Sequence, residues 1–195
     1  MNDTLFILPV IIRFLYGTGL RISEALSLRN QDVNLDQSYL TVKDAKNGKE
    51  RMLPISDSLS KVCKQYVHYR SLLPFDSTDN DYFFVTPTGN RCKRERVYRR
   101  FREILWKAGI PHSGHGPRVH DFRHTFSVHS LAMMADAGID LYCSLPTLST
   151  YLGHQSLSAT NGYVRLTSEM YPGLLRDVDQ VFLNVFPKNE CYEAN

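Results

Sequence analysis

A stretch near the start of the chain, SYLTVKDAKNGKERMLPIS, interrupts an otherwise helical pattern. Apolar and β-branched residues gather at 39–42 and 52–55, on either side of Asn47-Gly48. An Asn-Gly pair between two such runs is a strong hairpin signal, because both residues accept the positive φ angles of a tight turn. The stretch therefore predicts a small antiparallel sheet inside a mostly helical, α+β domain.

Helical spacing covers most of the remaining sequence, and its 195 residues suit one compact domain. Pro9 fits the first turn of the first expected helix, Ser56 can cap the third, and Gly138 can end the fifth. A short strand is expected from Tyr82. The expected helices cover residues 5–16, 20–33, 57–73, 93–108, 119–138, 145–152, 156–165 and 173–184.

Neither a membrane nor an oxidising compartment is expected. The apolar segment TLFILPVIIRFLYG is too short to span a bilayer, and Asp3 and Arg13 argue against a signal peptide. The four cysteines are widely spaced and form no C-x-x-C pair, which disfavours a zinc ribbon and a disulfide framework. A reducing, cytoplasmic location fits this cysteine usage.

Positive charge gathers in one part of the chain. Residues 91–123 hold ten basic and three acidic residues, although the whole chain has a net charge of only +3. Such a segment indicates a surface for a polyanion such as DNA, and the alternative is a solvated, arginine-rich helix face. The candidate phosphate contacts are Lys49, Arg91, Lys93, Arg94, Arg96, Arg99, Arg100 and Arg102.

Three short clusters carry side chains suited to phosphate chemistry. Arg21 lies in GTGLRISEALSL, where a helix starts after a glycine-bracketed turn, and it can offer a planar fork of donors to a phosphate. The alternative for Arg21 is an ordinary ion pair with Glu24 or Asp32. In YLGHQSLSATNGYVRLT, His154 is followed nine residues later by Tyr163, which is either a nucleophile or a buried structural tyrosine.

The third cluster is VHDFRHTF, in which His120 and Arg123 have the i, i+3 spacing of one helix face. One imidazole and one guanidinium can therefore contact the same anion. A zinc site at His120 and His124 is disfavoured, because no glutamate adjoins the first histidine and Arg123 lies in the same turn.

In order and spacing, these clusters resemble the catalytic signature of the tyrosine recombinases, the phage integrase family. TGLRISE is similar to the family's TGLRxSE, KNGKERMLPI to GKGNKERxxPL, and HDFRH to HxLRH. LGH precedes the nucleophilic tyrosine of that family by nine residues, as it precedes Tyr163 here. The resemblance covers about residues 5–165. It implies the catalytic residues Arg21, Lys46, His120, Arg123, His154 and Tyr163, with Lys49 as the rival of Lys46.

The resemblance implies a mostly helical fold with a three-stranded antiparallel sheet, and the catalytic domain of a site-specific DNA recombinase or integrase of a mobile element. In that reaction Tyr163 forms a 3′-phosphotyrosine, Arg21 and Arg123 neutralise the phosphate, His120 is the base, and Lys46 protonates the leaving 5′-oxygen. No metal, ATP or other cofactor is expected. The alternatives are strand relaxation like that of a type IB topoisomerase, and a non-catalytic DNA-binding remnant.

The resemblance also implies an organisation and a set of partners. Residues 1–186 are expected to form the catalytic domain and 187–195 a polar tail, without the N-terminal core-binding domain that family members carry. The expected partner is double-stranded DNA. We expect a tetramer on DNA that exchanges a C-terminal helix, and a monomer away from DNA.

Overall fold

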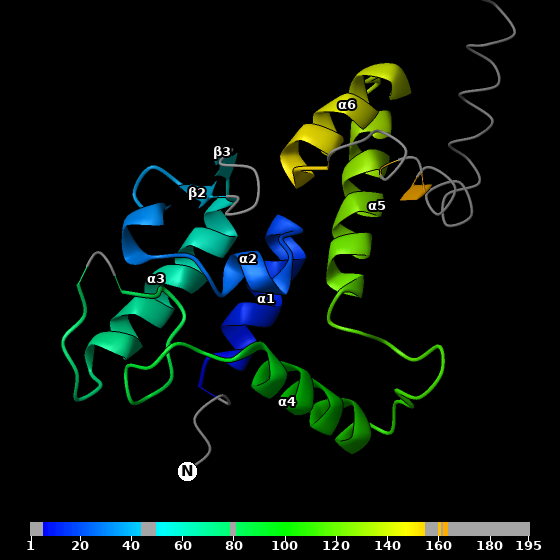
Figure 1. Cartoon of the computed structure of the whole chain (residues 1–195). Coiled ribbons are helices and arrows are strands. Elements are labelled where there is room, and N and C mark those ends of the chain that lie inside the picture. The colour runs from blue at the N-terminus through cyan, green and yellow to red at the C-terminus, as the bar shows by residue number, and fades with distance from the viewer. Residues whose placement is uncertain (1–5, 44–49, 79–80, 155–159, 161, 164–195) are drawn as a thin grey trace, which may run out of the picture. The chain divides into compact units, whose positions relative to one another are not determined.

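The computed structural model describes residues 6–43, 50–78, 81–154, 160, 162 and 163 (Figure 1). The chain divides into two units. Unit 1 comprises Met1–Ser127 together with Tyr151–Gly153, and unit 2 comprises Val128–Thr150 and His154–Asn195. The chain therefore leaves unit 1, returns to it for three residues, and leaves it again at the Gly153–His154 peptide bond.

Most of the described elements belong to unit 1. In chain order they are α1 (Leu8–Thr18), α2 (Ile22–Ala25), the 3-10 turn η1 (Asn30–Asp32), β1 (Val33–Asn34), β2 (Tyr39–Lys43), β3 (Glu50–Pro54), α3 (Asp57–Ser71) and α4 (Arg94–Lys107). Helix α5 (Asp121–Asp136) begins in unit 1 and continues into unit 2, whereas α6 (Leu141–Leu152) begins in unit 2 and ends in unit 1.

The sheet is antiparallel with the strand order β1-β2-β3, which confirms the expected hairpin and the three-stranded sheet. Leu40 pairs with Leu53 of β3 and with Val33 of β1. Leu40, Val42 and Leu53 are buried while their neighbours along the strands are more exposed, so one face of the hairpin contacts the core. The expected turn at Asn47-Gly48 lies outside the described residues.

The core of unit 1 forms around α1, which packs against α3. Pro9 lies in the first turn of α1 as expected, where its missing N–H removes no helical hydrogen bond. Phe14 of α1 contacts Phe84 edge to face, with ring centroids 5.1 Å apart. The buried Tyr66 hydroxyl donates to the Phe83 carbonyl at 3.0 Å and accepts from the Val85 amide at 3.1 Å, so α3 fixes this loop segment.

The expected helix over 20–33 is wrong beyond its first turn, because α2 ends at Ala25. The backbone after it bonds to a distant segment: the Leu28 carbonyl accepts from Phe83 N, and Asn30 N donates to the Asp81 carbonyl. The strand expected from Tyr82 is also absent among the described residues, where isolated bridges such as Arg29 to Tyr82 replace it. Pairing between segments about 50 residues apart thus overrides the local helical spacing.

The later helices match the expectations more closely. Ser56 caps α3, since its hydroxyl accepts from Leu59 N, and α4 buries Val97, Phe101 and Leu105 as one stripe. Helix α5 begins at Asp121, so His120 precedes the helix instead of lying on its face. The expected helix at 173–184 and the tail at 187–195 lie outside the described residues. No helix in the described part of the chain is long and apolar enough to cross a membrane.

Candidate active site

The turn between α1 and α2 presents Arg21. Helix α1 ends at Gly19, whose φ of 61° is left-handed, and a Cβ there would lie 2.3 Å from the Phe126 ring. Arg21 follows with extended backbone as the N-cap of α2, and its amide donates to Glu24 Oε2 at 2.8 Å. Its guanidinium contacts Glu24 Oε1 at 3.3 Å, and its side chain remains 43% exposed. The turn therefore orients an accessible arginine at the surface of unit 1.

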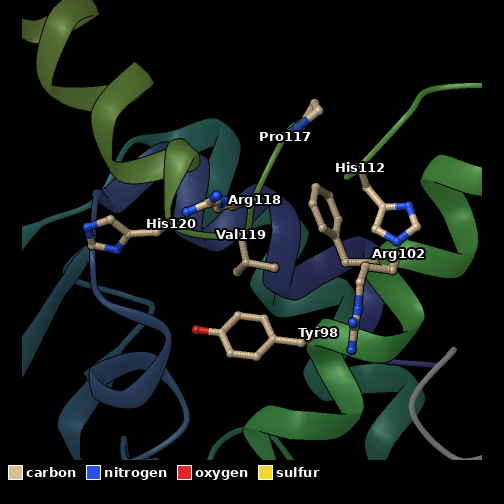
Figure 2. A pocket seen from close by; sticks show the side chains of 8 residues that line it. Tyr98, Arg102, His112, Pro117, Arg118, Val119 and His120 are labelled. Carbon is tan, nitrogen blue, oxygen red and sulfur yellow. The ribbon is translucent and has the colours of Figure 1, made fainter. Parts of the chain in front are cut away.

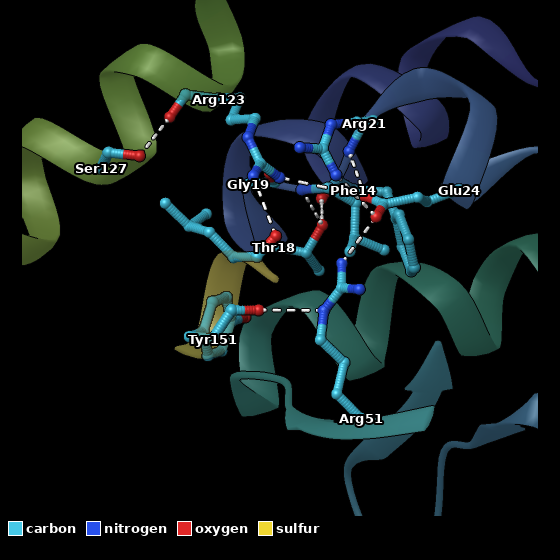
Figure 3. A network of polar contacts seen from close by, with 11 residues as sticks. Phe14, Thr18, Gly19, Arg21, Glu24, Arg51, Arg123, Ser127 and Tyr151 are labelled. Carbon is cyan, nitrogen blue, oxygen red and sulfur yellow. Dashed lines mark hydrogen bonds and ion pairs between the residues drawn. The ribbon is translucent and has the colours of Figure 1, made fainter. Parts of the chain in front are cut away.

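The Glu24 carboxylate forms ion pairs with three arginines that come from three different elements (Figure 3). Besides Arg21, it accepts from Arg51 of β3 at 2.8 Å and lies 3.9 Å from Arg123 Nη1 of α5. We call these four residues the arginine cluster. One negative and three positive charges give the arginine cluster a net positive charge, which suits an anionic ligand.

Arg123 is buried, with only 2% of its side chain exposed, in the first turn of α5. Its Nη1 donates to the Gly19 carbonyl at 2.8 Å, and its Nη2 donates to the Leu152 carbonyl at 2.9 Å. The guanidinium therefore joins the turn before Arg21 to the last residue of α6. A buried arginine held by backbone carbonyls and a carboxylate keeps one geometry, as a group that orients an anion must.

His120 lies next to the arginine cluster, one residue before α5 starts, and its carbonyl accepts from Arg123 N at 3.0 Å. Its ring meets the His124 ring edge to face, with centroids 4.9 Å apart. Burial lowers the pKa of His120 below 6.5, and the positive charges of His124, Arg123 and Arg21 lower it further. The neutral imidazole is thus favoured near neutral pH, and a neutral imidazole can accept a proton.

A cleft of about 450 Å³ adjoins His120 (Figure 2). The cleft is lined by Tyr98, Phe101 and Arg102 of α4 and by residues of the 112–120 segment. The cleft combines aromatic surface with arginine and histidine side chains. It therefore offers unit 1 a concave, cationic surface beside the candidate base.

The candidate phosphate contacts do not all have the same surroundings. Arg91 is held by the Leu26 carbonyl at 3.3 Å and by Ser27 Oγ at 2.9 Å. The Arg100 side chain is only 12% exposed and pairs with Glu103. Arg94 and Arg99 remain more than half exposed in their ion pairs. Lys93, Arg96 and Arg102 are also exposed, whereas Lys49 lies outside the described residues.

Unit 2 contains the two remaining described candidates. Gly153 leaves α6 with a φ of 66°, and the His154 amide donates to the Ser149 carbonyl at 3.0 Å. His154 Nδ1 lies 2.8 Å from Thr160 Oγ1, and the His154 ring stacks on the Tyr163 ring with centroids 6.1 Å apart. Tyr163 is 6% exposed. The structure thus brings His154 and Tyr163 together within unit 2.

The structure brings Arg21, His120 and Arg123 together within unit 1, and Lys46 lies outside the described residues. Of the two alternative partners of Arg21, Glu24 is the one that Arg21 contacts, whereas Asp32 pairs with Lys43 at 2.7 Å.

Sequence reasoning missed Arg51. Its place directly before the apolar run MLPI, inside the stretch KNGKERMLPI that resembles the family's GKGNKERxxPL, was a signal for it, but nothing in the sequence indicated its partners. No group of three or more His, Cys, Asp or Glu side chains in the described ranges could hold a metal ion.

Comparisons with known proteins agree on one family. The model of the phage integrase family matches residues 4–170. Tyrosine recombinase XerA of Pyrococcus furiosus is 35% identical over 165 residues, covering 82% of this chain and 50% of that protein.

Solved structures agree with this match. A crystal structure of XerA recombinase superposes with a TM-score of 0.65 at 28% identity, covering 84% of this chain and 55% of that one. The XerH site-specific recombinase, bound to a palindromic difH substrate after cleavage, has the same fold, with a TM-score of 0.66 at 22% identity over 93% of this chain and 47% of that one. This chain spans about half the length of the curated relatives it matches.

Proposed function

The chain belongs to the phage integrase family, and from this membership we propose that it is the catalytic domain of a site-specific tyrosine recombinase, which cuts and rejoins double-stranded DNA. The observation that carries the proposal is the arginine cluster, in which one carboxylate orients the two arginines predicted to bind the scissile phosphate. The names of the relatives, recombinases and integrases, favour strand exchange over simple relaxation or binding without catalysis.

The proposed role of Arg21 and Arg123 follows from the charge of the substrate. A phosphodiester is anionic and gains charge on its non-bridging oxygens as a nucleophile approaches phosphorus. Guanidinium groups held in place before the reaction stabilise that charge without reorganising. Glu24 and two backbone carbonyls hold Arg123 in this way.

The remaining side chains supply nucleophile, base and acid. Tyr163 Oη attacks phosphorus, the bond from phosphorus to the 5′-oxygen breaks, and a 3′-phosphotyrosine forms. His120 accepts the phenolic proton, and its lowered pKa keeps it neutral for that task. Lys46 donates a proton to the leaving 5′-oxygen, and His154 donates a hydrogen bond to a phosphate oxygen. A second 5′-hydroxyl then attacks the phosphotyrosine and restores a phosphodiester, so neither ATP nor a metal is consumed.

We assign DNA contacts to α4 and the 91–102 segment. Arg94, Arg96, Arg99 and Arg102 are exposed there, and such contacts position a protein on the phosphate backbone. Affinity for DNA should fall steeply with salt concentration. We further propose that residues 1–186 form the catalytic domain, that four chains assemble on DNA by exchanging a C-terminal helix, and that the reaction takes place in the cytoplasm.

The test is covalent capture. The chain is incubated with nicked suicide duplexes of randomised sequence, and a denaturing gel is searched for a protein–DNA band whose DNA is then sequenced. The proposal expects a band for the wild type and none for Tyr163→Phe, with the oligonucleotide mapped by mass spectrometry to the peptide that contains Tyr163. A band that persists in Tyr163→Phe would contradict the nucleophile assignment.

A further inference from the structure

Arg51 connects three parts of unit 1 that lie far apart in the sequence (Figure 3). Its Nη2 donates to Glu24 Oε1 at 2.8 Å, and its Nε donates to the Tyr151 carbonyl at 3.1 Å, across 100 residues of chain. Its side chain is 14% exposed. The two donors lie on one edge of the guanidinium plane, so a single rigid group sets the distance between Glu24 and the end of α6.

Gly153 gives a second, independent indication that this contact is closely fitted. A Cβ built on Gly153 would lie 2.7 Å from Arg51 Nη1 and 2.9 Å from its Cζ, and the φ of 66° is one that L side chains rarely adopt. The guanidinium therefore sits directly against the backbone of residues 151–153. The backbone angle favours glycine at this position, and a Cβ here would also push the Arg51 guanidinium away from its bonds.

The contacted segment leads directly to two residues of the proposed reaction. His154 follows Gly153 in the chain, and Tyr163 stacks on His154 within unit 2. Within unit 1, this backbone segment is held by Arg51 at Tyr151 and by Arg123 at Leu152. Arg51 is the second residue of β3, which begins four residues after Lys46 in the sequence.

We propose that Arg51 is a positioning residue of the recombination reaction: it anchors residues 151–153 to Glu24 and so fixes the backbone segment that His154 directly follows in the chain. It touches no reacting atom in this assignment, which rests on the proposed function. A displacement of about 1 Å in a reacting group can cost on the order of 100-fold in rate, so a loosened anchor should slow cleavage without weakening DNA binding.

The test compares Arg51→Met and Arg51→Lys with the wild type. Met keeps an unbranched side chain as far as the position of Nε and removes the guanidinium with its donors, whereas Lys restores a charge opposite Glu24 but cannot offer two fixed donors. Single-turnover formation of the covalent adduct is measured at saturating concentrations of a captured suicide duplex, and the Kd for that duplex is measured with Tyr163→Phe in the background. The expected result is a loss of about 100-fold in rate for Met, a smaller loss for Lys, and a Kd within about twofold.

Arg70→Met is the matched control. Arg70 is also a buried arginine of unit 1, with 8% exposure and bonds from Nη1 to Asn30 Oδ1 at 2.8 Å and to the Phe83 carbonyl at 2.7 Å. Its loss should lower stability but leave the adduct rate of the folded protein unchanged. Equal rate losses in Arg70→Met and Arg51→Met would overturn the assignment, as would an Arg51→Met rate within twofold of the wild type.

A readout that needs no catalysis separates this inference from the proposed function. Hydrogen exchange followed by mass spectrometry should show faster exchange in peptides covering residues 149–154 of Arg51→Met, and no such change in Arg70→Met. Unchanged exchange in that segment would refute the anchoring role even if the chain cleaves DNA. Absence of the adduct in the wild type would instead count against the proposed function.

Discussion

Replacing Glu24 by glutamine tests whether the arginine cluster depends on its single carboxylate. The substitution preserves the size of the side chain but removes its charge and puts an amide N–H₂ where one carboxylate oxygen accepts hydrogen bonds. Those oxygens accept from Arg21 N at 2.8 Å, Arg21 Nη1 at 3.3 Å and Arg51 Nη2 at 2.8 Å. Glu24→Gln should therefore leave guanidinium groups facing an amide that cannot satisfy them all.

The expected loss of stability can be bounded from these contacts. A hydrogen bond to a charged group contributes about 1.5–3 kcal/mol. The Arg21 side chain is 43% exposed, so its share is discounted for screening by solvent. Arg51 is 14% exposed and counts nearly in full. We expect Glu24→Gln to lower the free energy of unfolding by about 2–4 kcal/mol, which for a chain of this size lowers Tm by roughly 10 °C.

The assay is urea unfolding followed by circular dichroism, with the slope of free energy against urea checked for constancy between variants. Asp36→Asn is the control, because Asp36 pairs with Lys64 at 3.0 Å but is 93% exposed. That variant should lose about 0–1 kcal/mol. The reasoning would be refuted if Glu24→Gln lost no more stability than Asp36→Asn, since buried pairs can be replaced at little cost where the neighbours relax.

Three further predictions use the same structure. Gly19→Ala should cost more than the roughly 1–2 kcal/mol of left-handed strain, because its Cβ would also meet a ring at 2.3 Å; an unchanged urea midpoint would contradict this. The rate of adduct formation should fall as pH drops, with a midpoint below the ordinary histidine pKa of 6.5, because burial and nearby positive charges lower the pKa of His120; a rate midpoint that differs from the His120 midpoint measured by NMR would refute its role as base. Burial raises the pKa of Cys63 to about 12, so iodoacetamide at neutral pH should label the exposed Cys143 and leave Cys63 unlabelled until urea unfolds the chain, as peptide mass spectrometry can determine.

Local signals predicted much of the fold. The Asn47-Gly48 pair and its flanking apolar runs predicted strands that the structure confirms at 39–43 and 50–54. The stripe on α4 and the Ser56 cap were read correctly for the same reason, since a cap or a face depends on residues within a few positions. The failure at residues 26–33 has the opposite cause. There the backbone partners lie about 50 residues away, and no local pattern records them.

The candidate site likewise has features that short motifs predicted and features that depend on contacts between distant segments. Arg21, His120, Arg123, His154 and Tyr163 stand in short motifs, so their type and spacing could be read from the sequence. The burial of Arg123 and its bonds to Gly19 and Leu152 could not, because they depend on how α1, α5 and α6 meet within unit 1. Arg51 escaped notice because its partners, Glu24 and Tyr151, lie 27 and 100 residues from it.

The return of the chain to unit 1 at Tyr151–Gly153 has a consequence for how the protein is made. A ribosome releases the chain from its N-terminus, and domains form as their residues emerge. The acceptors of Arg51 and Arg123 at Tyr151 and Leu152 are among the last residues of unit 1 to appear. The entropic cost of closing a loop rises only slowly with its length, so bringing Arg51 to Tyr151 across 100 residues costs little more than closing a shorter loop. The time at which these bonds form is therefore set by the synthesis of residues 151–153. A nascent chain that already contains Arg21, Arg51 and Arg123 therefore lacks the bonds from Arg51 and Arg123 to residues 151 and 152 until translation has passed residue 153, and an unfinished chain meets DNA with an incompletely held arginine cluster.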